Sequence, residues 1–399
     1  MSGNTAPRHV AIYLAARAHG SREAVFLALA RQLLAAGSRV DVLAAGPLPW
    51  LREHLPDGAR LIDTDPCWLR LGPLSAPHAL RTYASVFRVA RYLGRERPDV
   101  LFATSIPPNM AALTARQLAR TATPVVIRQS NTIRIPGSER YAGVRGRWRD
   151  RLLPRIYPQA DAVIAVADGV GDNLRHLMDV QGKPLHIIYN GVDLAAIRCR
   201  ADVDPPHPWL APHAPPVVLA VGRLVGKKDY PTLLRAFARL RESQDVRLMI
   251  LGDGPERRRL ETLARELGIE HALALPGFAW NPYPYMSHAA CFALSSISEG
   301  MPSVLIEALA CGCPVVSTDC PAGPREILAD GEYGSLVPAG DARALAGALG
   351  ETLSAPPSAD RLRGRAEAFD SETVAERYLR VLAEVAHDAQ AHRAGPGRS

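Results

Sequence analysis

The sequence predicts an α/β protein with two Rossmann-like domains, and three observations support this fold class. Short apolar runs alternate with segments of helical periodicity along most of the 399 residues, a pattern typical of parallel sheets covered by helices. A proline-rich stretch at residues 201–216 interrupts this alternation near the middle of the chain. A hydrophobic content of 47% with 22% charged residues excludes disordered and fibrous proteins.

The first domain is expected to cover residues 1–195. It begins with a buried strand at 9–14, a loop at 17–22 and a helix at 23–36, in which Val25, Leu29 and Leu33 share one face. Further buried strands are expected at 40–44, 99–103, 124–128, 162–166 and 186–189. The repeated strand and helix pattern predicts one parallel sheet.

The second domain is expected at residues 217–370, after a proline-rich connection at 196–216. Its strands are expected at 217–221, 246–251, 272–275, 291–294 and 314–317, with helices at 230–241, 255–267 and 303–310. Residues 371–390 are expected to form a C-terminal helix that packs back on the first domain. Residues 391–399 are polar and rich in Gly, Pro and Arg, and a disordered tail is expected there.

Composition limits the classes of partner and compartment. The formal net charge of +7 favours acidic ligands or an anionic surface without requiring nucleic acid. No apolar run is long enough to span a bilayer, and the opening run at 10–16 is too short for a secretory signal. We therefore expect a cytoplasmic protein that can work at the inner face of the membrane.

The cysteines and histidines do not form a recognisable metal motif. Six cysteines are few for this length, and most lie in apolar surroundings, which favours buried thiols in a reducing compartment. Cys311, Cys313 and Cys320 lack a nearby histidine and the usual ligand spacing. No His-Glu-x-x-His pair occurs. No metal site is expected.

Residues 134–157 carry most of the excess positive charge, with seven arginines up to Arg155 against Glu139 and Asp150. Trp148 and Tyr157 lie among or just after these cations, so this segment favours peripheral contact with anionic lipid. The alternative is a solvated helix face packed on its own domain. A nucleic-acid partner is not expected, because no recognition motif accompanies the charge.

The run from Gly222 to Lys228 follows an expected strand and precedes an expected helix, where α/β folds bind phosphates. It differs from a P-loop in its glycine spacing and in having Lys228 where that motif needs a hydroxyl. Arg223 and Lys228 could clamp a pyrophosphate and neutralise charge as it leaves. The alternative is that both are ordinary surface cations.

Two further strand ends carry glycines. Gly252-Asp253-Gly254-Pro255 allows a tight turn toward a ligand or simply starts a helix, and Arg257 replaces the third glycine of a dinucleotide fingerprint. This substitution weakens an NAD hypothesis. Pro276-Gly277-Phe278 offers backbone amides and an aromatic face suited to a nucleobase, although a plain turn fits equally well.

The segment from Ser296 to Asp319 carries two carboxylates around an expected helix. Glu299 precedes the helix and Glu307 lies on its second turn, so one could face a ligand's sugar while the other reaches a ribose diol. The amides of Ser303 and Val304 begin the helix, where a phosphate is favoured by unsatisfied N–H groups and the helix dipole. The alternative is that Glu299 caps the helix and Glu307 is solvated.

Taken together, these motifs resemble the retaining glycosyltransferases of family four, also called group 1 glycosyltransferases. The resemblance covers nearly the whole chain and is carried by 190–193, 222–228, 252–255, 276–278 and the Glu299-x7-Glu307 block. It implies the GT-B fold, in which two Rossmann-like domains face a central cleft. It also implies a nucleotide-sugar substrate, no separate cofactor and no catalytic metal.

The resemblance assigns roles residue by residue in the second domain. Arg223 and Lys228 would hold the donor diphosphate, Glu299 the donor sugar and Glu307 the nucleotide ribose. The amides of Ser303 and Val304 would contact phosphate, and Phe278 would lie near the base. The remaining donor-binding positions implied are Gly222, Gly252, Gly277, Met301 and Pro302.

The first domain departs from the family pattern. The family's Gly-Gly loop stands here as Gly20-Ser21, which keeps a donor contact at Gly20 and leaves Ser21 uncertain. Its usual histidine near the end of the strand at 99–103 is replaced by Thr104-Ser105. His19, Arg128, Ser130 and Asn131 are the acceptor-side candidates.

Residues 128–131 and 318–326 resemble a subgroup that acts on hexosamine or galactose donors and builds cell-surface polysaccharide. The resemblance therefore implies transfer of a hexose or N-acetylhexosamine, UDP-linked, to a glycan or lipid-linked glycan acceptor. A sugar-nucleotide epimerase of the same fold and a non-catalytic binding module remain as alternatives. An oxidoreductase fits less well, because the glycine fingerprint is incomplete.

Overall fold

The computed structural model describes residues 6–14, 21–46, 49–66, 78–133, 152–177, 182–204 and 207–394. The chain forms two compact units, Met1–Gly191 with Ser371–Ser399, and Val192–Asp370. The chain therefore passes from the first unit to the second after Gly191. The sequence analysis expected this boundary at residue 195. Residues 196–201, which the sequence analysis included in the connection, belong to a helix that begins at Leu194.

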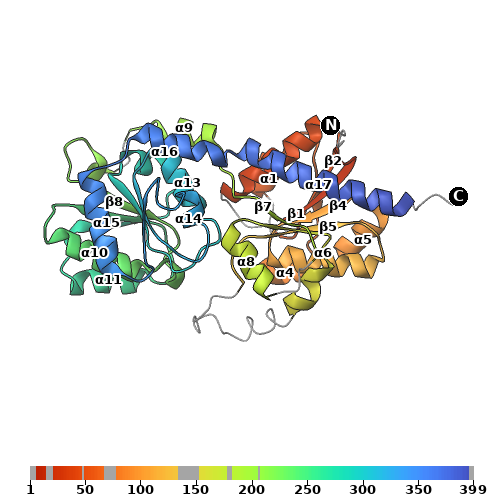
Figure 1. The fold of residues 1–399 in the computed structure, drawn as a ribbon, viewed down its shortest axis with the longest axis horizontal. Helices are drawn as coiled ribbons and strands as arrows, with labels where there is room; N and C mark the ends of the chain where they lie inside the picture. Colours follow the sequence, from red (N-terminus) through yellow and green to blue (C-terminus); the bar gives the residue numbers. More distant parts are fainter. Residues whose placement is uncertain are drawn as a thin grey trace. The chain divides into compact units, whose positions relative to one another are not determined.

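The first unit contains a parallel sheet with the strand order β3-β2-β1-β4-β5-β6-β7 (Figure 1). Its described strands are β1 (His9–Leu14), β2 (Arg39–Ala44), β3 (Arg60–Asp63), β4 (Val100–Ala103), β5 (Val125–Gln129), β6 (Ala162–Ala165) and β7 (Leu185–Ile187). Each pairs in parallel with its neighbours, as the alternation of strands and helices predicts. The predicted α/β class is confirmed in this unit.

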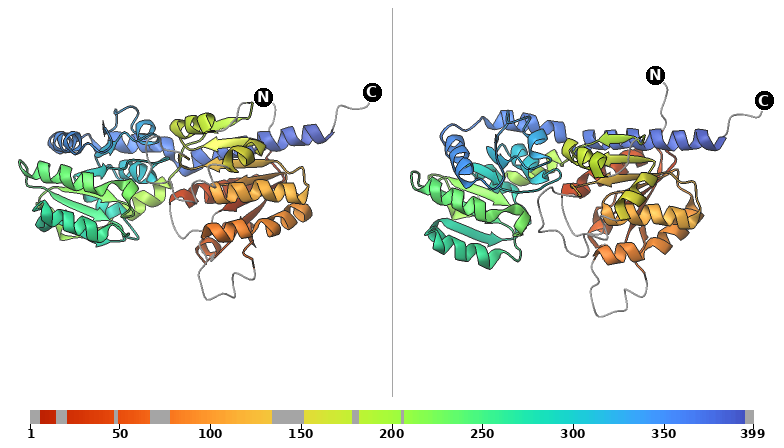
Figure 2. Two further views of the ribbon diagram at one scale, coloured as in Figure 1. Left: turned by 90° about the horizontal axis from the view of Figure 1, so that it is seen from below. Right: turned by 60° about the horizontal axis from the view of Figure 1, so that its bottom comes forward.

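Helices cover both faces of this sheet. Their bounds are α1 (Ser21–Ala35), α2 (Pro49–His54), α4 (His78–Ala84), α5 (Val86–Glu96), α6 (Ile106–Ala119), α8 (Asp168–Leu177) and α17 (Ser371–Ala394). Helices α1 and α17 lie on one face and α4, α5 and α6 on the other (Figures 1 and 2). Phe26 and Tyr378 meet Phe102 of the sheet at ring-centroid distances of 5.9 and 5.5 Å, which builds the core between α1, α17 and β4.

Helix α17 continues to Ala394, so residues 391–394 are helical where the sequence analysis expected the start of a disordered tail. Two long side chains hold these last turns on the first unit. Gln390 donates to Asp99 over 3.3 Å, and Arg393 donates to the backbone carbonyl of Ala122. The rest of the expected tail lies outside the described residues.

The second unit contains another parallel sheet, with the order β10-β9-β8-β11-β12-β13. Its strands are β8 (Val217–Val221), β9 (Arg247–Leu251), β10 (Leu273–Gly277), β11 (Cys291–Leu294), β12 (Val315–Thr318) and β13 (Ser335–Val337). Its helices are α9 (Leu194–Ala201), α10 (Tyr230–Arg241), α11 (Arg257–Glu266), α12 (Tyr283–His288), α13 (Ser303–Ala310), α14 (Pro324–Ile327), α15 (Ala342–Ser354) and α16 (Ala359–Ala366). Both units thus have the Rossmann strand order.

Two edge strands were not expected from the sequence. Strand β3 has no fully buried residue and β13 has only Val337 buried, so neither shows the continuous apolar run of a central strand. Both are short and pair on one side only within the described sheets. An edge strand needs less apolar sequence because part of it faces solvent.

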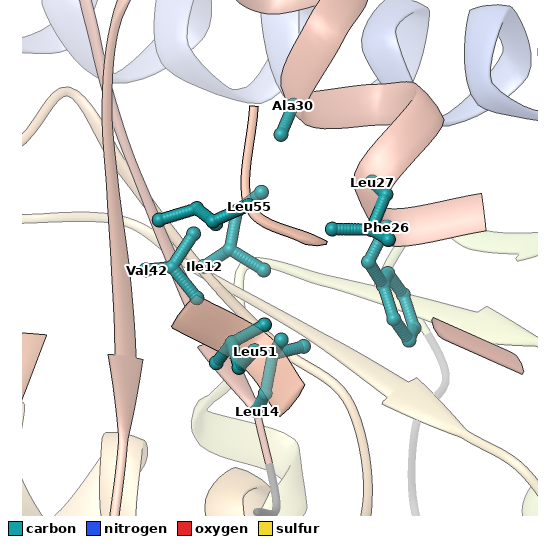
Figure 3. A pocket seen from close by; sticks show the side chains of 8 residues that line it. All are labelled: Ile12, Leu14, Phe26, Leu27, Ala30, Val42, Leu51 and Leu55. Atoms are coloured by element: carbon teal, nitrogen blue, oxygen red, sulfur yellow. The ribbon is translucent and has the colours of Figure 1, made fainter. Parts of the chain in front are cut away.

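A small apolar cavity of about 10 Å³ lies between β1, α1 and α2 of the first unit. Figure 3 shows the side chains that surround it, namely Ile12, Leu14, Phe26, Leu27, Ala30, Val42, Leu51 and Leu55. A space of this size and lining has no polar partner to hold even one water. It is a packing defect of the core and not a ligand site.

Asp41 is fully buried in β2 and anchors a polar network beneath α5. Its carboxylate accepts hydrogen bonds from Tyr92 at 2.6 Å and from Arg60 at 2.8 Å, and it contacts His9 Nε2 at 2.9 Å. Burial alone would raise the pKa of Asp41, but the bonds from His9, Tyr92 and Arg60 outweigh it and hold that pKa well below its ordinary value. Asp41 is therefore ionised and held by all three neighbours.

The described cysteines carry free thiols, and Cys291, Cys311, Cys313 and Cys320 are buried. Burial raises the pKa of Cys291 to about 12, which makes this thiol unreactive at neutral pH. Cys199 of α9 differs in being exposed, and Cys67 lies outside the described residues.

Candidate functional site

The candidate site lies at the carboxyl ends of β8 and β11 in the second unit. These two strands are neighbours in the sheet although β9 and β10 separate them in sequence, so they mark the point where the strand order reverses. Open α/β sheets bind ligands in the crevice at this point. The loops after the two strands are joined, because Ile297 N donates to Lys227 O at 3.0 Å and Ser295 Oγ donates to Lys228 O at 2.7 Å.

Glycines allow the strand-end loops to approach each other at backbone contact distance. Gly252 has φ +141°, and a Cβ there would lie 2.0 Å from the carbonyl oxygen of Gly222. Gly222 has φ +155°, and its Cβ would lie 2.9 Å from Cε of Lys228. Gly252 N also donates to Gly277 O at 2.7 Å, which links the ends of β9 and β10. Gly252 cannot be replaced without moving the backbone of the loop, and the positive φ of Gly222 would strain any other residue there.

Glu299 is the electrostatic centre of the joined loops and is 7% exposed. Its carboxylate lies 2.7 Å from Nζ of Lys228 and 3.2 Å from Nζ of Lys227, and it accepts from Ser296 Oγ at 2.9 Å. Burial opposes ionisation, but the two ammonium groups and the hydroxyl together hold the pKa of Glu299 below its ordinary value. The structure thus places two of the sequence candidates, Lys228 and Glu299, in one buried ion pair.

Arg223 lies on the same loop as Lys228 but is exposed. Within the described part of the chain its guanidinium forms no ion pair, whereas Lys228 is committed to Glu299. An exposed guanidinium beside a buried ion pair can move onto an incoming anion without breaking an internal contact. Arg223 is therefore the cation of this loop that is available to a ligand.

Helix α13 begins after Pro302, which supplies no side-chain cap. Met301 and Pro302 are buried and hold the turn, while Ser303 and Val304 are partly exposed at the first helical turn. The helix therefore begins at Ser303, as predicted, and the positive end of its dipole lies at the candidate site.

Glu307 is 7% exposed and lies one turn further along α13. Its charge adds to burial in raising the pKa of Tyr283 of α12 and of Cys311. Glu307 is thus buried beside α12 and is not the solvated residue of the alternative hypothesis.

Phe278, directly after β10, is 63% exposed and meets Trp280 edge to face with ring centroids 5.1 Å apart. Trp280 is 69% exposed. This geometry leaves an aromatic surface open near the Gly252 and Gly277 turns, as a base-stacking role requires.

The sequence analysis missed three contributors to the site. Lys227 and Ser296 both bind Glu299, and Tyr230 at the start of α10 is 4% exposed with a hydroxyl that has no hydrogen-bond partner among the described residues. Burial, followed by the charge of Glu299, raises the pKa of Tyr230. The doubled lysine was a visible signal for Lys227, whereas only the fold brings Ser296 and Tyr230 to this place.

The acceptor-side candidates of the first unit lie partly in its interior. Arg128 is 3% exposed, and its guanidinium donates to Tyr378 Oη at 2.7 Å, to Ser130 Oγ at 2.6 Å and to Asn190 Oδ1. Asn131 is exposed just after this cluster. The structure thus brings Arg128 and Ser130 together at the end of β5. His19, Gly20 and most of the basic segment 134–157 lie outside the described residues.

The described parts of the chain contain no group of three His, Cys, Asp or Glu side chains placed to hold a metal ion. Their helices include none that combines the length and apolar character of a membrane span.

Comparison with sequence families divides the chain in the same way as its two sheets. Residues 23–196 match the family described as Glycosyltransferase Family 4, and residues 206–369 match Glycosyl transferases group 1.

Two curated relatives agree with these matches. A Campylobacter jejuni protein, N-acetylgalactosamine-N,N'-diacetylbacillosaminyl-diphospho-undecaprenol 4-alpha-N-acetylgalactosaminyltransferase, is 35% identical over 58% of this chain and 62% of its own length. The lipopolysaccharide core biosynthesis glycosyltransferase LpsE of Rhizobium meliloti is 36% identical over 42% of this chain and 50% of its own. The chain thus matches about half to three fifths of these relatives' lengths.

A solved structure shares the fold over nearly the whole chain. Anabaena Alr3699/HepE in complex with UDP superposes with a TM-score of 0.71 at 19% identity, covering 94% of this chain and all of that one. At that identity the likeness concerns the fold alone. The two family matches, together with the two parallel sheets and the motifs at their strand ends, show that this chain belongs to the group 1, family 4 glycosyltransferases with the GT-B fold.

Proposed function

We propose that this protein is a retaining glycosyltransferase that moves a hexose or N-acetylhexosamine from a UDP-linked donor to a glycan or lipid-linked glycan acceptor in cell-surface polysaccharide synthesis. The observation that carries the proposal is the buried Lys228–Glu299 pair at the strand-order reversal, with the exposed Arg223 on the same loop. The ionised carboxylate of Glu299 can accept a hydrogen bond from a sugar hydroxyl, and the exposed guanidinium of Arg223 can bind a diphosphate.

In the proposed reaction the acceptor hydroxyl attacks the anomeric carbon while the bond from that carbon to the diphosphate oxygen breaks. The acceptor proton passes to a phosphate oxygen of the leaving group, on the same face of the sugar. Arg223, Lys228 and the start of α13 at Ser303 stabilise the negative charge that develops on the diphosphate. Glu299 orients the donor sugar, and Glu307 holds the ribose.

The donor and acceptor classes are supported by the relatives. The name of the Campylobacter protein describes transfer to a diphospho-undecaprenol-linked glycan, and the Anabaena structure holds UDP. The exposed Phe278 offers a stacking surface for the base. By the same reasoning the protein would act at the inner face of the membrane without a metal or separate cofactor, and residues 134–157 would contact lipid.

Nucleotide selectivity tests the donor site. UDP at about a hundred times its dissociation constant should add about 2.7 kcal/mol to the free energy of unfolding, which raises Tm by several degrees. The measurement is a thermal melt with UDP, GDP, ADP or NAD. A shift with UDP alone is expected. A shift with NAD alone, or no shift with any nucleotide, would contradict the assignment of this site.

Arg223→Ala should lower the rate of transfer about a hundredfold, because it removes a charge-assisted contact to the leaving diphosphate worth about 3 kcal/mol. The assay follows UDP release and product formation from a panel of UDP-sugars with a lipid-diphosphate-linked glycan. Arg258→Ala, another exposed arginine of the same unit, is the control and should keep full activity.

The stereochemical part of the proposal is tested on the product. NMR coupling constants of the new glycosidic bond should report the same anomeric configuration as the donor. An inverted product would rule out the same-face mechanism while leaving the donor site assignment intact.

A further inference from the structure

We propose that the outer face of α4 and α5 is a docking surface for membranes that contain anionic phospholipid. The surface, here called the α4–α5 face, consists of Leu80, Tyr83, Phe87, Arg88, Arg91 and Arg95. It lies in the first unit, on the sheet face opposite α1 and α17 (Figure 1). None of its residues belongs to the segment 134–157 or to the candidate site of the second unit.

Helices α4 and α5 follow each other with only Ser85 between them. Ser85, between them, has helical dihedral angles of φ −76° and ψ −7°. Its hydroxyl and backbone belong to the inner side, where Tyr13 of β1 reaches Thr82 O at 3.3 Å. Val89 and Leu93 continue this inner side and are fully buried. A packed interface therefore fixes how α5 lies on the sheet, which leaves its opposite side outward.

Large apolar side chains line the outward side. Leu80, Tyr83 and Phe87 are 50%, 39% and 76% exposed; Leu80 and Tyr83 lie one turn apart on α4, and Phe87 lies in the first turn of α5. Single exposed apolar residues are common on soluble proteins, but three this close together in the chain are typical of an interaction surface. Phe87, the most exposed of them, projects from a rigid helix and would insert first into an apolar phase.

Three exposed arginines follow these apolar residues on α5. Arg88, Arg91 and Arg95 are exposed and form no ion pair with the described residues, whereas Arg81 of the inner side pairs with Asp65. The one carboxylate of α5, Glu96, is engaged by Arg39 and Arg60 on its own side. Nothing described on the outer face therefore neutralises the three guanidinium groups.

This combination favours a lipid surface over other partners. A helix that lies in the plane of a bilayer buries its apolar residues at the acyl boundary while long arginine side chains reach back to the headgroups. The three exposed arginines complement anionic headgroups, and Leu80, Tyr83 and Phe87 suit the acyl boundary beneath them. A polyanion such as RNA would use the arginines and leave Leu80 and Phe87 in water.

The test is sedimentation of the full-length protein with vesicles of phosphatidylcholine alone or with 30 mol% phosphatidylglycerol. Binding to the anionic vesicles is expected, and it should weaken as the salt concentration rises. Replacing Arg88, Arg91 and Arg95 by Gln should reduce the partition coefficient about a hundredfold, at roughly fivefold for each arginine. Phe87→Ser should reduce it about tenfold by removing the inserted ring.

Matched controls come from the second unit. Arg235, Arg239 and Arg258 are exposed arginines without a described ion pair, and their triple replacement by Gln should leave vesicle binding unchanged. Val203→Ser is the apolar control at 52% exposure. Thermal melts with UDP confirm that each variant is folded, and since transfer to a water-soluble acceptor is measured separately, lipid docking and the proposed reaction can fail independently.

Three results would overturn the proposal. They are anionic-vesicle binding that survives the triple arginine variant, equal loss in the control triple variant, and binding to RNA but not to vesicles. The first would move lipid contact to another surface, such as residues 134–157.

Discussion

Replacing Lys228 by Met is expected to lower the rate of transfer about a thousandfold. The variant keeps the length of the side chain but leaves the carboxylate of Glu299 buried without the ammonium group that lies 2.7 Å away. It also removes a cation from the loop that would face the leaving diphosphate. The measurement is steady-state transfer, with a thermal melt in the absence of nucleotide to show that the variant is folded.

Lys227→Met is the matched control because its Nζ also contacts Glu299, at 3.2 Å, but its side chain is 38% exposed against 12% for Lys228. A half-exposed ammonium group contributes little to holding Glu299, so the rate of transfer should fall by less than about tenfold. Equal effects of the two substitutions would contradict the assignment of Lys228.

The Lys228→Met variant should also change the pH profile. In the native protein the pKa of Glu299 is held below its ordinary value, so the acidic limb of the rate lies below that value. Without Lys228, burial outweighs the remaining attractions and the pKa rises, so activity should be lost at a higher pH than in the native enzyme. An unchanged acidic limb would mean that Glu299 does not control it.

The second large effect concerns stability. Asp41→Ala should lower the free energy of unfolding by about 3 kcal/mol, because it leaves Arg60, His9 and Tyr92 without their shared acceptor. For a unit of this size that corresponds to a decrease in Tm of roughly 6 to 12 °C. Thermal melts monitored by circular dichroism measure it.

Glu96→Gln provides the comparison for Asp41. Glu96 pairs with Arg39 and Arg60 of the same network, but its side chain is 32% exposed against 0% for Asp41. Its loss should cost less than about 1 kcal/mol. A larger effect for Glu96 than for Asp41 would show that burial does not decide the strength of this network.

The Asp41 contribution has a defined dependence on pH. Its pKa is lower in the folded than in the unfolded protein, so its stabilisation is complete above the ordinary aspartate value of 3.8. It is lost as the pH falls below that value and the unfolded state takes up a proton first. Asp41→Asn should therefore have a flatter stability profile in acid than the native protein.

The central strands could be predicted because each is a continuous buried apolar run. Strands His9–Leu14, Val217–Val221 and Cys291–Leu294 have the bounds that the sequence indicates. The helices Tyr230–Arg241 and Ser303–Ala310 do as well, since a proline lies at the start of each amphipathic pattern. Edge strands such as Arg60–Asp63 carry no such run and were missed.

The candidate site was predictable where its residues lie in one short segment. Gly222, Arg223 and Lys228 follow one strand, and Glu299, Ser303 and Glu307 follow another, so their order along the chain already places them at strand ends. The pairing of Lys228 with Glu299 was not predictable, because it depends on β8 and β11 being neighbours in the sheet.

Arg128 shows the same limit in the first unit. Its sequence neighbours suggest an open binding residue, yet Tyr378 and Asn190 enclose it from distant parts of the chain. The sequence by itself determined the two α/β units, the glycine turns and the charged residues at the strand ends, because strand burial, helix periodicity and turn chemistry act over a few residues. The tertiary structure alone decided which charges are paired and which stay exposed, because partners such as Lys228 and Glu299 meet only when separate strands pack into one sheet.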